Sequence, residues 1–465
     1  MLHFPTIKMQ LKQEKTFEDL GLRVPTILLP RQGIDLEKWA VVACDQHTSE
    51  PEYWKSVTEF VGDYPSTLDM MFPEVYLGKG EDDQRIAAIN ETMNYYLHKG
   101  VLVPRSPGFV VVDRELLNRK HRQGLMVALD LEQYDYRQGS QSLIRATEAT
   151  IEDRLPPRIA IRKNAPIEMP HIMVLIDDPR GTVISAAYSE PELEERVLYD
   201  TQLMQGGGRV TGYHITDETT IDSIANALMQ LKDEKTESTG QTPMLYAMGD
   251  GNHSLATAKK IWEDIKTKAG GLAAVRDHPA RYALVELVNI HDKGLDFEAI
   301  HRVVFSVNDE NIFKEMQKFY AAQGSEFTQG VYSSEESLAA RIKELEGQKA
   351  HVIRYITRNK RYGLLVIKNP KALLPVETLQ KFLDDYLQKR EAQGLILSKI
   401  DYIHGDNETA ALAAQPNNIG FLLSSMQKDE LFQYVAKNGP VPRKTFSLGH
   451  AHDKRYYMEA RMIVQ

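Results

Sequence analysis

The chain has 465 residues, of which 42% are hydrophobic and 26% are charged, as is usual for a globular protein with a sizeable core. Its formal net charge of −9 and the lack of a basic stretch argue against a nucleic-acid-binding surface, and no apolar run is long enough to span a membrane. The segment Met1 to Lys15 shows no signal-peptide pattern, and the single cysteine, Cys44, excludes an intramolecular disulfide and any site with several cysteines. We therefore expect an acidic, soluble, cytoplasmic protein with no nucleic-acid or membrane partner.

The first part of the chain predicts a polar loop at the end of a buried strand. Residues 38–44 read as the strand and residues 52–61 as a helix. The loop between them carries Asp45, Gln46, His47 and Glu50. Loops at strand ends often carry functional residues, whereas Cys44 itself is expected to be a small buried hydrophobe.

Apolar periodicity then predicts a mixture of helices and strands along the whole chain. The expected helices cover residues 82–99, 217–232, 255–268, 311–322, 334–346 and 376–390. The expected strands cover residues 108–113, 124–130, 171–179, 281–290, 297–305, 352–355, 362–367 and 418–423.

Two stretches between these elements have ambiguous chemistry. The pair Pro156-Pro157 predicts a rigid turn, and the arginines around it are phosphate ligands or plain surface charges: Arg145, Arg154, Arg158 and Arg162. Residues 205–213 form a glycine-rich loop that lacks the lysine and hydroxyl of a P-loop, so this loop is weak support for phosphate binding.

The most informative stretch is Leu245 to Lys259, where an apolar run ends in Gly249-Asp250-Gly251 and an amphipathic helix follows. Glycines permit a tight turn, and a helix start presents unpaired N–H groups to an anion. Asp250, Asn252, His253 and Ser254 lie within this single turn. Asn252 or Ser254 could instead act only as a helix cap, with His253 on the surface.

Cations occur in three further turns, at His301-Arg302, at His404 and at Arg443-Lys444. Acidic strand ends combined with basic turns suit a phosphorylated small molecule, because phosphoryl transfer needs positioning and charge neutralisation above all. The chain has no H-E-x-x-H zinc motif, no G-x-S-x-G nucleophile elbow and no Rossmann fingerprint.

The turn Gly249 to Ser254 resembles the D-G-H-H-R motif of an uncharacterised bacterial family, domain of unknown function 1015. Further stretches resemble the same family: Ala43–Gln46, Ile144–Glu148, Pro170–Val174, Ile300–Val303 and Pro442–Lys444. The turn is also similar, more distantly, to one in the archaeal ADP-dependent free serine kinases, which have the ParB/sulfiredoxin fold.

These resemblances imply a mixed α+β fold, with a ParB/sulfiredoxin-like core that carries large insertions and a second α+β unit. Residues 1–300 would form the catalytic domain, and residues 301–465 would pack onto its site. Asn252 and Ser254 depart from the motif, and serine cannot supply the bidentate phosphate contact of the arginine that it replaces. Arg145, Arg302, Arg443 or Lys444 would then take over this contact.

The resulting hypothesis is a small-molecule phosphotransferase that uses a nucleotide (ADP or ATP) and Mg²⁺, with serine as a candidate acceptor. The implied catalytic residues are Asp45, Asp250 and His253, with Glu50 or Glu52 in reserve as the base and Asp250 as the Mg²⁺ ligand. The implied binding residues are Gln46, His47, Arg145, Asn252, Ser254, His301, Arg302, His404, Arg443 and Lys444. A nucleotide- or metabolite-binding regulatory module without turnover and a phosphate-ester hydrolase are the alternatives, and a homodimer is compatible with all three.

Overall fold

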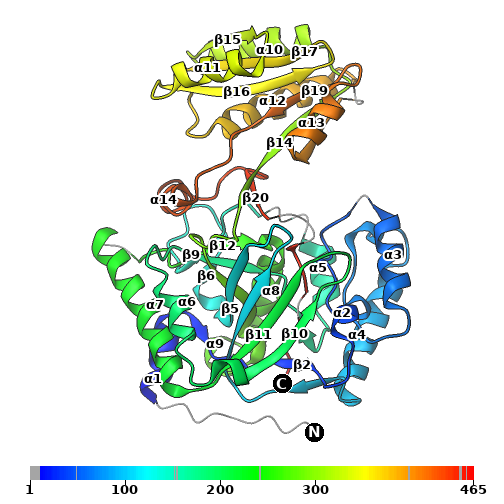
Figure 1. The fold of residues 1–465 in the computed structure, drawn as a ribbon, viewed down its shortest axis with the longest axis vertical. Helices are drawn as coiled ribbons and strands as arrows, with labels where there is room; N and C mark the ends of the chain where they lie inside the picture. Colours follow the sequence, from blue (N-terminus) through cyan, green and yellow to red (C-terminus); the bar gives the residue numbers. More distant parts are fainter. Residues whose placement is uncertain are drawn as a thin grey trace. The chain divides into compact units, whose positions relative to one another are not determined.

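The structure is a computed structural model that describes residues 11–48, 50–150, 152, 155–239, 242–395, 398–449, 453–456 and 458–465. It has the mixed α/β fold that the sequence predicts (Figure 1). The chain divides into two compact units. Unit 1 comprises Met1–Asp296, Lys428–Pro440 and Leu448–Gln465, and unit 2 comprises Phe297–Gln427 and Val441–Ser447.

Unit 1 is built on a mixed sheet whose strands are adjacent in the order β10-β11-β4-β5-β13-β9-β12-β7-β6, with β1 also on β5. The strands are β1 Leu22–Arg23, β4 Phe109–Glu115, β5 His121–Asp130, β6 Tyr134–Asp135, β7 Ile144–Arg145, β9 Met173–Ile176, β10 Val197–Gln202, β11 Arg209–Ile215, β12 Tyr246–Asp250 and β13 Tyr282–Asn289. The pairings from β10 to β13 are antiparallel, whereas β13 with β9 and β12 with β7 are parallel.

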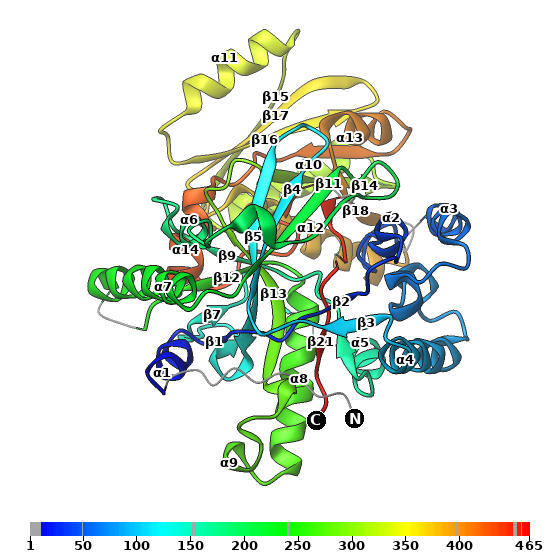
Figure 2. The ribbon, with the colours of Figure 1, turned by 60° about the horizontal axis from the view of Figure 1, so that its bottom comes forward.

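Successive residues of a strand point to opposite faces of the sheet, so one central strand contributes to the cores on both faces. In β4, Phe109 and Val111 belong to one hydrophobic core, and Val110 and Val112 belong to another. The helices of unit 1 are α1 Leu11–Asp19, α2 Leu36–Trp39, α3 Pro51–Val61, α4 Asp82–His98, α5 Leu155–Arg162, α6 Thr182–Ala187, α7 Glu218–Thr239, α8 Asn252–Lys268, α9 Leu272–Val275 and α14 Lys428–Asn438. In both views α2, α3 and α4 gather at one side of the unit (Figures 1 and 2).

The C-terminal segment, meaning the described residues 453–456 and 458–465, lies along unit 1 in a mostly extended conformation. It pairs with residues 41–43, bridges Leu28 through Ala460, and forms the short sheet of β8 Ile167–Glu168 with β21 Arg461–Met462. Another two-stranded sheet joins β2 Leu28–Pro30 to β3 Leu102–Pro104. Met458, Ala460 and Ile463 of this segment are therefore part of the core of unit 1, whereas Val464 and Gln465 are exposed.

Unit 2 contains a sheet with the order β15-β17-β16-β19-β14-β18, and β20 also pairs with β14. Its strands are β14 Phe297–Phe305, β15 Glu326–Val331, β16 Ala350–Thr357, β17 Lys360–Lys368, β18 Lys399–His404, β19 Ile419–Leu422 and β20 Phe446–Leu448. Its helices are α10 Asp309–Ala322, α11 Glu335–Leu345, α12 Pro375–Ala392 and α13 Asp406–Ala413. Leu365 and Ile367 of β17 pack in the core with α10 and α12, whereas Leu364 and Val366 pack with α11.

The predicted strand at residues 38–44 is wrong. Asp35 caps a short helix, α2, by accepting a hydrogen bond from the Glu37 N–H at 3.2 Å. The extended residues that follow pair with the C-terminal segment instead of joining the main sheet: the Ala43 N–H donates to the Lys454 carbonyl at 2.7 Å. The apolar run correctly predicted that these residues are buried, but burial alone does not identify a strand.

The rigid turn predicted at Pro156-Pro157 is also wrong, because both prolines lie near the start of α5. A proline lacks the N–H group, but the N–H groups of the first helical turn have no partner within the helix.

Among the helices of the described residues, none combines the length and apolar character that a bilayer crossing demands.

Candidate functional site

The strand–turn–helix predicted around Gly251 is confirmed. Strand β12 ends at Asp250, and α8 begins at Asn252. Gly251 has φ +81°, a left-handed conformation that strains any other residue, and it lies against Ile172. One Asp250 oxygen, Oδ1, accepts a hydrogen bond from the Gly251 N–H at 2.8 Å. The turn therefore fixes the Asp250 carboxylate beside the N-terminus of α8.

Replacing Gly251 with alanine is expected to lower the free energy of unfolding by about 2 kcal/mol, the cost of a left-handed alanine plus steric contact. The new Cβ would lie 3.0 Å from Ile172 Cγ1. Gly270→Ala is the matched control, because Gly270 has φ +83° and no heavy atom within 4 Å of the added Cβ. Urea unfolding should show a larger loss for Gly251→Ala than for the control; equal losses would mean that the Ile172 contact has no cost.

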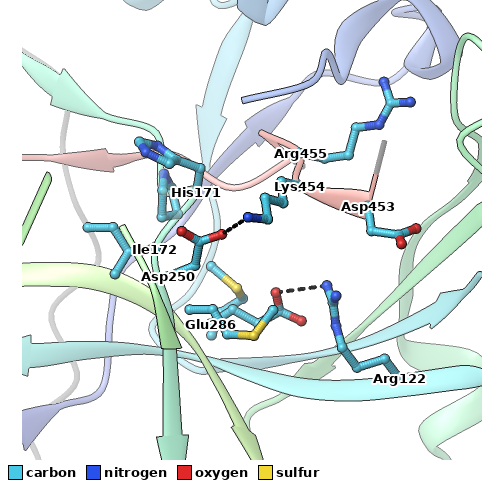
Figure 3. Close-up of a pocket in the computed structure, with 11 residues that line it drawn as sticks. Arg122, His171, Ile172, Asp250, Glu286, Asp453, Lys454 and Arg455 are labelled. Atoms are coloured by element: carbon cyan, nitrogen blue, oxygen red, sulfur yellow. Dashed lines mark hydrogen bonds and ion pairs between the residues drawn. The ribbon is translucent and has the colours of Figure 1, made fainter. Parts of the chain in front are cut away.

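A lysine from the C-terminal segment completes the turn. Lys454 Nζ lies 2.8 Å from Asp250 Oδ2 (Figure 3). Burial alone would lower the pKa of Lys454, but the charges of Asp250, Asp45 and Glu148 outweigh it and raise this pKa. Lys454 is thus a cation rather than a base. The charges of Asp45 and Asp250, two of the predicted site residues, both contribute to its raised pKa.

Backbone pairing explains how residues so distant in sequence meet. The Ala43 N–H donates to the Lys454 carbonyl, and the Tyr456 N–H donates to the Val41 carbonyl at 2.9 Å. The C-terminal segment is thereby held beside the start of the 45–50 loop. Asp45 and Lys454 come from paired segments, whereas Asp250 comes from the end of β12.

A pocket of about 350 Å³, counted with its part open to solvent, lies at this point of unit 1. Its charged or polar lining residues are Arg122, His171, Asp250, Glu286, Asp453, Lys454 and Arg455. Arg122 Nη2 lies 3.3 Å from Glu286 Oε2, across the pocket from the pair of Lys454 and Asp250 (Figure 3). Because cations and carboxylates line this pocket together, its chemistry favours a charged group over an apolar one.

The glycine-rich stretch at residues 205–208 has a structural role beside this pocket. The Arg455 Nη2 group donates to the Met204 carbonyl at 2.8 Å, and a Cβ on Gly207 would lie 2.4 Å from that same nitrogen. Arg114 Nη2 donates to the Gly207 carbonyl. The glycines therefore make room for two buried guanidinium groups.

The other predicted residues of the 45–50 loop form local contacts. Gln46 Nε2 donates to Asp45 Oδ1 at 2.9 Å. The His47 ring stacks on Tyr53 at 3.7 Å, and its Nδ1 lies 3.1 Å from Glu50 Oε1. Ser49 lies outside the described residues.

At the start of α8, Ser254 Oγ lies 3.1 Å from Nε2 of His171. Asn252 and His253 occupy the first two positions of the helix and are half-buried. These three predicted residues are therefore within one turn of Asp250, but their proposed contact with phosphate stays a prediction.

The predicted arginines before α8 bind other protein groups. Arg145 is buried and donates to the carbonyls of Ser142 and Thr242. Thr242 precedes the start of β12, whereas Asp250 is the last residue of this strand. Arg158 pairs with Glu74, and Arg162 pairs with Glu168. Arg154 lies outside the described residues.

The remaining predicted residues belong to unit 2, and two of them have structural partners there. The Leu423 N–H donates to Nδ1 of His301 at 3.1 Å, so Nε2 carries the ring hydrogen and faces Asp406 at 2.8 Å. Burial lowers the pKa of His301 although Asp406 counteracts it. Arg302 is fully buried and donates to Gln380 Oε1 and the carbonyls of Ile300 and Arg443.

His404, Arg443 and Lys444 are more exposed than this pair. His404 Nδ1 lies 4.0 Å from Glu298, and Arg443 Nη2 lies 3.5 Å from Asp384. Lys444 has φ +55° in an exposed turn. The role of these unit 2 residues as phosphate ligands stays a prediction.

The role of Asp250 as a Mg²⁺ ligand stays a prediction. Both Asp250 oxygens are engaged, one by the Gly251 N–H and one by Lys454. Within the described part of the chain, no group of three His, Cys, Asp or Glu side chains could hold a metal. Cys44 accepts a hydrogen bond from the Tyr456 hydroxyl at 2.9 Å, and burial, followed by the charge of Asp45, raises the pKa of its thiol, which favours the neutral form over the nucleophilic thiolate.

The same C-terminal segment contains a carboxyl group that makes stability depend on pH. Burial, together with the charge of Glu286, raises the pKa of Glu459 from 4.5 to about 7. The unfolded chain therefore loses this proton at lower pH than the folded chain, and stability falls as the pH rises from about 4.5 to about 7.

Glu459→Gln is expected to remove this loss, which amounts to at most about 3 kcal/mol above pH 7. Thermal unfolding across this pH range should show a flatter profile for Glu459→Gln than for the natural chain. Glu194→Gln, at an exposed carboxylate, should leave the profile unchanged. A Glu459→Gln profile as steep as that of the natural chain would contradict this assignment.

Comparison with known proteins gives a family but no established activity. No curated protein matches the chain. Solved structures that are similar to it include a conserved hypothetical protein from Pyrococcus furiosus, with 11% identity, TM-score 0.36, and coverage of 73% of this chain and 95% of that one. A free serine kinase variant in complex with ADP shows 9% identity, TM-score 0.39, and coverage of 74% and 93%. C-terminally truncated SbnI from Staphylococcus aureus shows 9% identity, TM-score 0.32, and coverage of 70% and 82%.

The resemblance inferred from the Gly249–Ser254 turn is confirmed for most of the chain. The profile of the family described as protein of unknown function (DUF1015) matches residues 28–386, and the chain therefore belongs to this family.

Proposed function

We propose that unit 1 binds a phosphorylated small molecule at the N-terminus of α8 and transfers its phosphoryl group to an alcohol. The observation that carries this proposal is Lys454, a largely buried cation that contacts Asp250 and interacts with Asp45 and Glu148. Phosphoryl transfer requires a fixed cation to neutralise the transferring group and a carboxylate to accept the acceptor's proton. Lys454 supplies the cation, and Asp45, whose charge acts on Lys454, supplies the carboxylate.

In this proposal the transferring phosphoryl group exchanges for Asp250 on the Lys454 ammonium. The start of α8 presents backbone N–H groups and the positive end of the helix dipole, which favour a phosphate group. Asp45, in the loop that follows the residues paired with the C-terminal segment, accepts the proton of the attacking hydroxyl. A donor nucleotide would arrive with its own Mg²⁺ as part of the substrate, and none of these roles requires a metal held by the protein.

The direct test is incubation of the chain with Mg²⁺ and ATP, ADP or pyrophosphate, together with a panel of small alcohols that begins with L-serine. ³¹P NMR should show a new phosphomonoester. Asp45→Asn should abolish its formation while it preserves nucleotide binding by calorimetry. Glu59→Gln, at an exposed carboxylate of α3, is the matched control and should be as active as the natural chain.

Two other results would replace the proposal. Nucleotide binding without a new phosphorus signal under any condition would indicate a regulatory binding module. Release of inorganic phosphate alone, with or without an alcohol, would indicate a hydrolase. Because both alternatives keep the ligand at Lys454, they differ from the proposal in the chemistry and not in the place of binding.

A further inference from the structure

The contact between Ser254 and His171 brings a hydroxyl and an imidazole together beside the pocket. Ser254 Oγ lies 3.1 Å from His171 Nε2, which is the distance of a hydrogen bond between a nucleophile and its base. Ser254 is the third residue of α8, and His171 lines the pocket immediately before β9 (Figure 3). A helix cap does not explain this geometry, because the hydroxyl contacts a side chain of another element.

The surroundings of His171 hold the ring in place. The Tyr456 ring packs edge-on against it at 4.9 Å between centroids, and the Tyr456 hydroxyl is held by Cys44. Glu74, the first residue of a short helix at Glu74–Tyr76, interacts with His171 as an opposite charge. Glu74 therefore places a carboxylate near the ring that would receive the Ser254 proton.

We propose that Ser254 is the nucleophile of a covalent phosphoryl-enzyme intermediate and that His171 is its general base. This inference rests on the proposed function, because it assigns the path that the phosphoryl group takes in the same pocket. It places a two-step transfer where a direct transfer between donor and acceptor would otherwise occur.

In the first step, Ser254 Oγ forms a bond to the phosphorus of a phosphoanhydride donor. The donor's P–O bond breaks, its electron pair stays on the departing oxygen, and the hydroxyl proton moves to His171 Nε2. In the second step, the alcohol oxygen attacks the phosphorus and gives its proton to Asp45. Ser254 Oγ then leaves with the electron pair and recovers the proton from His171.

A fluorophosphonate probe tests the pair without any nucleotide. The natural chain should be labelled at Ser254, located by peptide mass spectrometry, and Ser254→Ala should not be labelled. His171→Gln should slow labelling about 100-fold, the usual contribution of a general base. Absence of labelling in the natural chain, or an unchanged rate in His171→Gln, would overturn the inference.

A second variant reports on the pair even if His171→Gln fails to fold. In Ser254→Cys the imidazole should generate a thiolate, so iodoacetamide should alkylate it rapidly at neutral pH. Ser337→Cys is the matched control, because Ser337 is also half-buried at the third position of a helix, α11, and its hydroxyl contacts only its own capping box. The natural chain, whose single cysteine is Cys44, measures the background alkylation. Equal alkylation rates in the two cysteine variants would contradict an activated Ser254.

Failure of this inference can be separated from failure of the proposed function. With a phosphoryl donor, Asp45→Asn should accumulate phosphorylated Ser254, because the second step lacks its base. Transfer to an alcohol without labelling or phosphorylation of Ser254 would retain the proposed function and remove the covalent intermediate. Labelling of Ser254 without transfer from any donor would retain the activated Ser254 and contradict the proposed phosphoryl transfer.

Discussion

Replacing Lys454 with methionine is expected to lower both nucleotide binding and phosphoryl transfer about 100-fold, the usual cost of removing one preorganised charge from a transition state. Methionine keeps the length of the side chain but removes the ammonium that contacts Asp250 at 2.8 Å. Asp250, Asp45 and Glu148 would then repel an incoming phosphate, because the cation with which all three interact is gone. Calorimetry with the nucleotide and ³¹P NMR of the reaction measure the two effects.

The same change should also cost stability, about 2 kcal/mol, because it leaves Asp250 without the cation in a partly buried place. Lys260→Met is the control, since Lys260 lies on the exposed side of α8, 3.8 Å from Asp264, in a pair of little energetic value. Equal nucleotide binding in Lys454→Met and Lys260→Met would contradict a role of the Lys454 ammonium in binding the phosphate.

Replacing Arg461 with methionine is expected to destabilise the chain by about 4 kcal/mol, the usual cost of leaving one member of a buried ion pair without its partner. Arg461 Nε donates to Glu168 Oε1 at 2.8 Å, and both side chains are buried. Burial alone would raise the pKa of Glu168, but Arg461 and Arg162 lower it, so this carboxylate is ionised and depends on both guanidinium groups. Urea unfolding of the folded variant measures the loss.

The Arg461 variant has a second consequence, because Arg461 anchors the segment that carries Lys454. Loosening that segment should weaken nucleotide binding as well as stability. Arg341→Met, which removes an exposed pair with Glu344, should change neither property. Full stability in Arg461→Met would show that the C-terminal segment is held by its apolar residues alone.

Local patterns in the sequence predicted the local geometry of the site. The apolar run into Gly249-Asp250-Gly251 and the amphipathic residues after it correspond to β12 and α8, since Leu255 and Trp262 are buried in the core. The predicted strands at residues 352–355 and 362–367 are likewise confirmed as parts of β16 and β17, which form a hairpin with Thr357 paired to Lys360. In each case a single element or turn supplies all the residues that the pattern needs.

The partners of that turn could not be predicted, because they depend on pairings between distant segments. Nothing in the residues around Lys454 or His171 indicates that their side chains meet α8, and no periodic pattern marks an extended segment that crosses the unit. Arginines posed a different difficulty. Arg145 and Arg302 look the same in sequence as phosphate ligands, but their guanidinium groups donate to backbone carbonyls and, for Arg302, to Gln380. The homodimer and the cytoplasmic location stay predictions from the sequence.

A crystal structure of the chain with Mg²⁺ and a non-hydrolysable ATP analogue tests the central claim most directly. We expect the terminal phosphates within hydrogen-bond distance of Lys454 Nζ and of the first-turn N–H groups of α8, with the pair of Lys454 and Asp250 broken or shared. A nucleotide bound elsewhere on the chain, with that pair unchanged, would contradict the account.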